Sequence, residues 1–136
     1  EKAVTFYLDT NTYVEFLRGR SPTVGDRLRA QTPSNVRLPS MVKAELLFGA
    51  AMSRDPEAEA AKVNAFIDAF EIEAFGSGAA AQYAETRSAL QRAGQAIGPN
   101  DLVIAATVLA TGGTLVTHNV EEFQRIPGLN VADWQQ

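Results

Sequence analysis

The sequence lacks cysteine, and it has neither an excess of positive charge nor a long apolar run. Without cysteine, a disulfide framework and a thiolate metal site are excluded, and a reducing compartment, the cytoplasm, is the favoured expectation. The longest apolar run, residues 102–110, is far shorter than the roughly 20 residues that cross a bilayer, so no membrane partner is expected. The net charge of −4 excludes binding of nucleic acid by bulk electrostatics, and any such contact must be local.

Several catalytic motifs are missing as well. The sequence contains no Gly-rich phosphate loop, no GxSxG elbow and no HExxH pair. The single histidine, His118, cannot supply both the acid and the base of a metal-free ribonuclease, and we assign it no catalytic role. P-loop nucleotide hydrolysis, serine hydrolysis and zinc proteolysis therefore lose their usual support.

Short apolar strands alternate with helices along the chain. The patterns predict strands at residues 4–8, 36–38, 71–75, 114–117 and 129–131, and helices at about 12–17, 23–31, 40–50, 57–69, 79–93, 99–110 and 120–123. Thr12 and Glu15 form a capping-box pair that is predicted to begin the first helix. This alternation favours one α/β domain over residues 1–136, with three α/β/α layers and a short, mostly parallel central sheet.

Acidic residues recur where such a sheet forms its ligand site, just beyond the carboxyl ends of the strands. Asp9 ends the first strand, and Glu45 lies in the helix after the second. Asp101 opens the most apolar helix, while Asn119 and Glu122 follow the strand at 114–117. All of these side chains can reach the same edge of the sheet.

Each acid also has an ordinary explanation. Asp9 can serve as a helix cap, and Asp101 suits the first turn of a helix, where negative charge is favourable. Glu45 is harder to explain in this way, because it borders the apolar face of its helix, where a carboxylate is unusual unless it is paired or bound to a cation.

Grouping these acids points to a metal ion. Two carboxylates about 4 Å apart repel by roughly 4 kcal/mol at an effective dielectric constant of about 20, and a divalent cation relieves that repulsion. With oxygen ligands and no cysteine, Mg²⁺ fits best, and Mn²⁺ is a possible substitute. Metal-activated water is a nucleophile for phosphodiester hydrolysis, so the residues favour a metal-dependent nuclease.

Four segments in the same order resemble the PIN domain of bacterial VapC-type toxins, and the likeness runs almost end to end. These segments are YLDTN at 7–11, AELLFGA at 44–50, IGPNDLVIAA at 97–106, and LVTHNVEEF at 115–123 with RIPGL at 125–129 and Trp134.

The resemblance implies a Mg²⁺-dependent endoribonuclease that acts as the toxin of a type II toxin–antitoxin pair. It further implies a small VapB-like antitoxin as partner, a homodimer, and a larger toxin–antitoxin assembly. By this resemblance Asp9 and Asp101 are the principal metal ligands, and Glu45 and Glu122 complete the catalytic acids. The auxiliary residues are Asn11, Thr117 and Asn119, of which Asn119 is suited to orient water or a ligand.

Two surfaces carry weaker expectations. Arg18 and Arg20, in the loop after the first helix, are candidates for contacts with RNA phosphates, although a solvated loop explains them as well. Apolar residues on the early helices are candidates for the antitoxin groove, although core packing explains them nearly as well: Phe16, Leu17, Leu47 and Phe48.

Two other functions remain open at this point. The segment DTNT at 9–12 faintly matches the opening of phosphatases with an aspartate nucleophile, but Asn11 and Tyr13 depart from that motif, and no lysine follows Lys62. A PIN-like binding module without activity is the other alternative. Retention of four acids argues against it, because a scaffold has no need to hold charges that repel one another.

Overall fold

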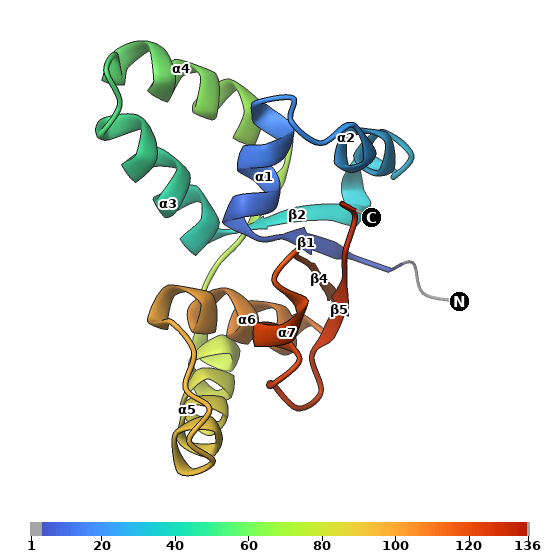
Figure 1. The fold of residues 1–136 in the computed structure, drawn as a ribbon, viewed down its shortest axis with the longest axis vertical. Helices are drawn as coiled ribbons and strands as arrows, with labels where there is room; N and C mark the ends of the chain where they lie inside the picture. The colour runs from blue at the N-terminus through green and yellow to red at the C-terminus, as the bar shows by residue number, and fades with distance from the viewer. Residues whose placement is uncertain (1–3, 136) are drawn as a thin grey trace.

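Five short parallel strands form one sheet in the computed structural model of the protein, which describes residues 4–135 (Figure 1). The strands are β1 (Phe6–Leu8), β2 (Val36–Pro39), β3 (Glu71–Glu73), β4 (Thr114–Val116) and β5 (Asn130–Ala132). Their order is β3-β2-β1-β4-β5, and each neighbouring pair is parallel. Helices flank this sheet, so the predicted α/β/α class is confirmed.

Each predicted helix is present, and Figure 1 shows α1–α4 above the central strand β1 and α5–α7 below that strand. Within residues 4–135, no helix combines the length and apolarity that crossing a bilayer requires. The helices are α1 (Thr10–Leu17), α2 (Pro22–Arg29), α3 (Ser40–Ala51), α4 (Pro56–Ile67), α5 (Ser77–Arg92), α6 (Pro99–Thr111) and α7 (Val120–Phe123), with a 3₁₀ turn at Pro33–Asn35.

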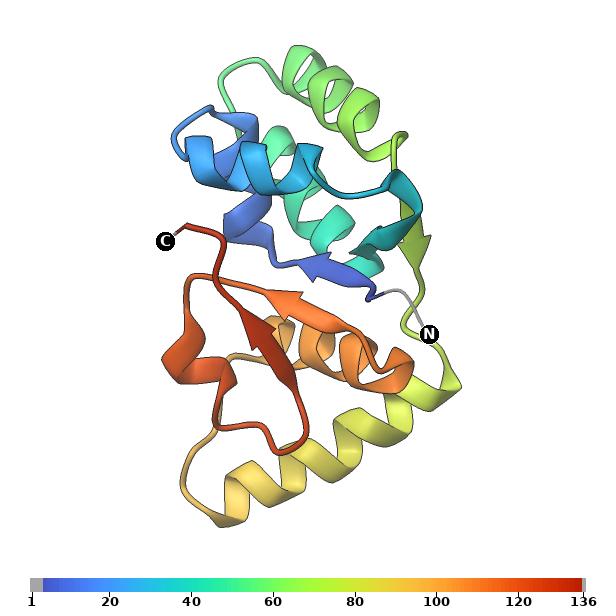
Figure 2. The ribbon, with the colours of Figure 1, turned by 90° about the vertical axis from the view of Figure 1, so that its right-hand side faces the viewer.

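The course of the chain through the sheet determines where a site can form. From the central strand β1, the chain first builds β2 and β3 on one side, and then returns to build β4 and β5 on the other. Figure 2 shows β1, β4 and β5 side by side. The strand order therefore reverses between β1 and β4, and ligands of open α/β sheets bind beyond the carboxyl ends of the strands at such a point.

Helix α6 forms a large part of the core, as its unbroken apolar sequence predicts. Ile104, Ala105 and Val108 are completely buried. Thr107 is the one polar residue on its buried surface, and its hydroxyl donates to the carbonyl of Val103 at 2.9 Å. A polar side chain satisfied inside its own helix costs little in the core.

The predicted start of the first helix is wrong. Asp9, not Thr12, is the N-cap of α1, and the Asp9 carboxylate accepts a hydrogen bond from the backbone N–H of Thr12 at 2.9 Å. Glu15, the other half of the expected capping box, instead pairs with Arg20 at 3.1 Å. The helix begins earlier because the carboxylate at the end of β1 already satisfies its free N–H groups.

Gly113, between α6 and β4, lies against β1 so closely that no side chain fits there. A Cβ at this position would lie 2.5 Å from Cε1 of Tyr7 and 2.9 Å from the carbonyl oxygen of Thr5. Gly113→Ala should lower the free energy of unfolding by about 1–3 kcal/mol, measured by denaturant titration. Gly49→Ala is the matched control, because an added Cβ there meets nothing within 4 Å. The control should stabilise the protein by about 0.5–1 kcal/mol, and equal effects of both substitutions would contradict the prediction.

Candidate active site

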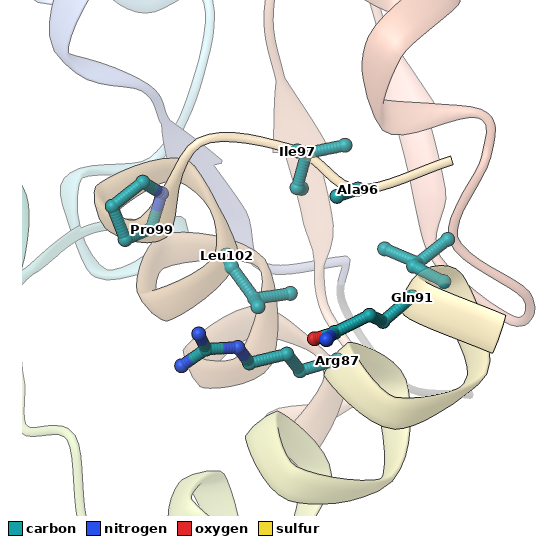
Figure 3. Close-up of a pocket in the computed structure, with 7 residues that line it drawn as sticks. Arg87, Gln91, Ala96, Ile97, Pro99 and Leu102 are labelled. Carbon is teal, nitrogen blue, oxygen red and sulfur yellow. The ribbon is translucent and has the colours of Figure 1, made fainter. Parts of the chain in front are cut away.

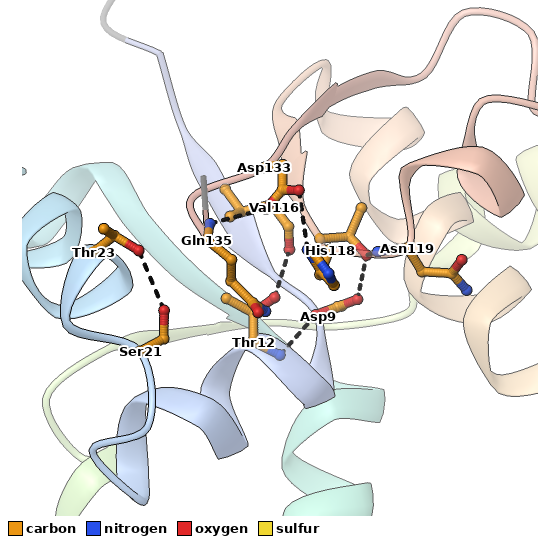
Figure 4. Close-up of polar contacts among 10 residues, drawn as sticks. Asp9, Thr12, Ser21, Thr23, Val116, His118, Asn119, Asp133 and Gln135 are labelled. Atoms are coloured by element: carbon orange, nitrogen blue, oxygen red, sulfur yellow. Dashed lines mark hydrogen bonds and ion pairs between the residues drawn. The ribbon is translucent and has the colours of Figure 1, made fainter.

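Asp9 lies at the carboxyl end of β1 and is almost completely buried, with 6% of its surface exposed. One carboxylate oxygen accepts the backbone N–H of Thr12, and the other accepts the hydroxyl of Thr117 at 2.6 Å. Burial raises the pKa of Asp9, whereas the hydrogen bonds from Thr117 and Thr12 lower it. Figure 4 shows Asp9 between the start of α1 and the segment that follows β4.

The segment after β4 connects Asp9 to Glu122. The buried Thr117 hydroxyl, which donates to Asp9, also accepts the backbone N–H of Asn119 at 3.0 Å. The side-chain amide of Asn119 then donates to Oε2 of Glu122 at 2.8 Å. Three of the predicted residues, Thr117, Asn119 and Glu122, are therefore connected to Asp9 by one series of hydrogen bonds.

Glu45 approaches the same edge from α3. Its Oε1 accepts a hydrogen bond from the hydroxyl of Thr10, the residue directly after Asp9. Its Oε2 accepts the side-chain amide of Asn100, the residue directly before Asp101, at 3.3 Å. The Glu45 carboxylate thus joins the first turns of α1 and α6.

Asp101, in the first turn of α6, shows that the four acids are neighbours. Its burial, together with a hydrogen bond to Glu122, raises its pKa to about 7. The charges of Glu122, Asp9 and Glu45 act in the same direction. The Asp101 carboxyl therefore keeps its proton to a higher pH than an ordinary aspartate does, because ionising it would add one more negative charge to a partly desolvated group of carboxylates.

Oxygen atoms of this edge fit a hydrated divalent cation. Among the described residues, Oε1 of Glu122 is buried and accepts no hydrogen bond. Residues 4–135 contain no group of three His, Cys, Asp or Glu side chains close enough to enclose a metal ion by themselves. Mg²⁺ usually takes one or two carboxylates and keeps several waters, so neighbouring acids of this kind suit Mg²⁺ better than an ion held only by protein ligands.

The remaining predicted residue, Asn11, is not part of these contacts. It is exposed on α1, and among the described residues no hydrogen bond connects its side chain to the four acids. Conversely, Thr10 and Asn100, which donate to Glu45, are not among the predicted residues. Both flank a predicted acid in the sequence, and that adjacency is the signal that marks them.

His118 points away from Asp9. Its Nδ1 lies 3.1 Å from Oδ2 of Asp133, beyond β5, and most of its side chain is exposed (Figure 4). Asp133 also accepts the backbone N–H of Gln135 at 2.9 Å. The histidine therefore connects the ends of β4 and β5, and no contact joins it to the four acids among the described residues.

Another hollow, of about 160 Å³, lies between α5 and α6. Figure 3 shows Arg87 and Gln91 of α5 facing Pro99 and Leu102 of α6 across it. None of its lining residues is acidic, and Arg87 instead contacts the hydroxyl of Tyr83 at 2.8 Å. This hollow has no groups for metal-assisted chemistry, so the edge beside Asp9 remains the candidate site.

The raised pKa of Asp101 predicts that the stability of the folded protein depends on pH. Its pKa is about 7 in the folded protein, against an ordinary value of 3.8. Between pH 3.8 and about 7, the folded state therefore binds a proton at Asp101 that the unfolded state has largely released. This group therefore makes the protein less stable as pH rises from 3.8 to about 7. Asp101→Asn should unfold at a higher temperature than the parent above pH 7, and at nearly the same temperature near pH 4, with a chelator present.

Thermal unfolding followed by circular dichroism across this pH range measures the difference. Glu121→Gln is the control, because Glu121 is the exposed neighbour of Glu122. Parallel pH profiles for Asp101→Asn and the parent would show that the folded protein does not penalise the ionised Asp101.

Comparison with known proteins agrees with this architecture. The PIN domain family model matches residues 6–129. The chain is 35% identical to the tRNA(fMet)-specific endonuclease VapC of Salmonella typhimurium over 95% of this chain and 97% of that protein. It is 34% identical to ribonuclease VapC2 of Rickettsia felis, over 96% of this chain and 98% of that protein.

Solved structures give the same result. The DNA-bound VapBC structure from Salmonella typhimurium superposes with a TM-score of 0.91 at 33% identity, over 97% of this chain and 99% of that chain. VapBC2 of Rickettsia felis, bound to a DNA fragment from its promoter, gives a TM-score of 0.87 at 33% identity, over 96% of this chain and 98% of that chain. The chain therefore belongs to the PIN domain family, and within that family to the VapC group.

Proposed function

We propose that this protein is a divalent-metal-dependent endoribonuclease and the toxin of a toxin–antitoxin pair. The observation that carries the proposal is the meeting of Asp9, Glu45, Asp101 and Glu122 at one edge of the sheet, where their mutual repulsion helps to raise the pKa of Asp101 to about 7. A protein that only binds a partner has no use for such repulsion. Its relatives named ribonuclease, and its membership of the PIN family, support RNA cleavage over the phosphatase alternative.

In this proposal Asp9 and Asp101 would hold Mg²⁺ or Mn²⁺, and Glu45 and Glu122 would complete the acidic edge around the ion. When bound, the ion supplies an activated water and neutralises the charge that develops on the phosphate. Thr117 keeps the Asp9 carboxylate in place through its hydroxyl, and Asn119 does the same for Glu122. Thr10 and Asn100 hold the two oxygens of Glu45.

Cleavage of RNA by the purified protein tests the proposal. We expect cleavage with Mg²⁺ or Mn²⁺ and none after chelation. Asp9→Asn and Asp101→Asn should each reduce the rate by about 100-fold or more, because each removes a charge that holds the ion. Binding of Mn²⁺, followed by calorimetry, should weaken in the same variants.

Glu121→Gln is the matched control, since it removes an exposed carboxylate from the same helix, α7, and should cut RNA at the parental rate. Undiminished cleavage by both aspartate variants would remove the mechanism proposed here. An inactive parent that still folds and binds a partner would favour the alternative of a PIN-like binding module.

The partner in this proposal is a small VapB-like antitoxin, bound to a toxin homodimer within a larger assembly. Structures of VapBC complexes similar to this chain support such a partner. Of the apolar candidates for its groove, Phe48 is 68% exposed and Leu17 is 38% exposed, whereas Phe16 and Leu47 are half-buried against the core. Phe48 is therefore the strongest candidate for an anchor in the antitoxin interface.

Co-expression with the antitoxin from the adjacent reading frame tests this partner. Phe48→Ser should weaken the complex by about 2 kcal/mol, roughly 30-fold in the dissociation constant, because a large apolar contact is lost. Val4→Ser, at another exposed apolar position, is the control and should bind normally. Failure of the parent chain to co-purify with any such partner would favour a stand-alone nuclease.

A further inference from the structure

A contact between His118 and Asp133 ties the segment after β4 to the segment after β5. Nδ1 of His118 lies 3.1 Å from Oδ2 of Asp133, and because a carboxylate only accepts, this nitrogen carries the hydrogen. The side chain of Asp133 is 9% exposed, whereas that of His118 is 63% exposed. An exposed histidine thus donates to an almost buried carboxylate, and removing the ring would leave one oxygen of Asp133 without this donor.

Asp133 is a fixed partner for the histidine. Its Oδ1 accepts the backbone N–H of Gln135 at 2.9 Å. The residue between them, Trp134, is buried and packs on Phe6 of β1, with ring centroids 5.1 Å apart. The place of the His118 ring is therefore set by a segment that the core holds.

His118 is the middle one of three consecutive residues whose side chains each donate to a carboxylate. Thr117, before it, donates to Asp9 at 2.6 Å, and Asn119, after it, donates to Glu122 at 2.8 Å. Only the middle side chain turns away from the four acids, to the end of β5 (Figure 4). Its contact can therefore fix the backbone between the other two residues without touching any of the four acids.

The start of α7 depends on such an anchor. Asn119 is the N-cap residue of α7, but its side chain accepts no N–H of the helix, and its amide donates to Glu122 instead. A helix of only four residues has little stability of its own, so contacts outside the helix determine its orientation. The buried ring of Phe123 holds the end of α7 in the core, and the link from His118 to Asp133 holds the segment that leads into it.

We propose that His118, held by Asp133, is a positioning residue that keeps the Asn119 amide on Glu122 for the cleavage reaction. The inference rests on the ribonuclease function proposed above. The ring takes no direct part in the reaction, because it lines an open hollow of about 450 Å³ whose lining includes none of the four acids. It acts through the backbone between residues 117 and 119, and its loss would free the Asn119 side chain to leave Glu122.

Single-turnover cleavage of RNA by an excess of the full chain with Mg²⁺ tests this role. His118→Ala should lower the maximal rate by about 10-fold, because residues that orient the groups of a metal site are typically worth about 10- to 100-fold. The protein concentration that gives half of the maximal rate should not change, because the ring holds no substrate. An unchanged maximal rate would overturn the inference, and so would a change confined to the half-maximal concentration.

Two matched variants accompany His118→Ala. His118→Asn should recover most of the lost rate, because its side-chain amide lies about where the ring Nδ1 lies and can donate to Asp133. Glu121→Ala removes another exposed side chain from the lining of the same hollow and should cut at the parental rate.

A second substitution tests whether His118 acts through Asn119. In the Asn119→Ala background, His118→Ala should cause no further loss of rate, because the side chain that the ring orients is already absent. A histidine that only stabilises the fold would lower the rate by the same factor in both backgrounds. Such independent effects would overturn the inference.

A measurement without RNA separates this inference from the function on which it rests. In ¹H–¹⁵N NMR spectra, the side-chain amide signals of Asn119, identified by their loss in Asn119→Ala, should shift in His118→Ala and return toward the parental position in His118→Asn. If they do so while the parent chain with Mg²⁺ fails to cut RNA, the orientation of Asn119 by His118 stands and the ribonuclease function fails. If the parent cuts RNA and these signals stay in place in His118→Ala, the function stands and the inference is overturned.

Discussion

The buried carboxylate of Asp9 is the constraint on which the rest of the site depends. A charge with only 6% of its residue surface exposed is tolerated only where donors surround it. The donors are the backbone N–H of Thr12 and the hydroxyl of Thr117, which belong to α1 and to the segment after β4. Satisfying one carboxylate therefore fixes the start of α1 against the end of β4. These two elements border the edge where the other three acids arrive.

That edge costs the protein stability, and α6 shows how the cost is offset. Asp101 lies in the first turn of α6 with its pKa raised to about 7, while Ile104 and Val108 farther along the same helix are completely buried. The apolar part of α6 gains free energy from burial, and its first turn loses some where the acids repel one another. The burial of α6 therefore offsets the repulsion at its own first turn.

The fold could be predicted almost completely, since apolar runs and Gly or Pro boundaries mark its strands and helices locally. The choice between two possible caps of α1 could not. The chain offers two caps three residues apart, Asp9 and Thr12, and the local pattern favours Thr12 because Glu15 follows it. Asp9 is the cap because the hydroxyl of Thr117, which is more than a hundred residues later in the sequence, donates to the same carboxylate. No pattern within a single helix contains that information.

The acids and the residues that support them also differ in whether the local sequence or the packing of distant elements determines them. Element order alone predicts that the four acids lie near one edge of a parallel sheet, because Asp9 and Glu122 come after strands, Asp101 begins a helix, and Glu45 lies in the helix after β2; their catalytic role stays a prediction. Thr10 and Asn100 could not be predicted, because their donation to Glu45 depends on how α1, α3 and α6 pack. Yet each directly neighbours an acid, Asp9 or Asp101, and donates to a third one. In the first turn of a helix, adjacent side chains point in different directions, so the residue beside an acid at this edge is well placed to hold the acid of another element. Polar residues adjacent to predicted ligands are therefore where supporting contacts should be sought in other sheets of this kind.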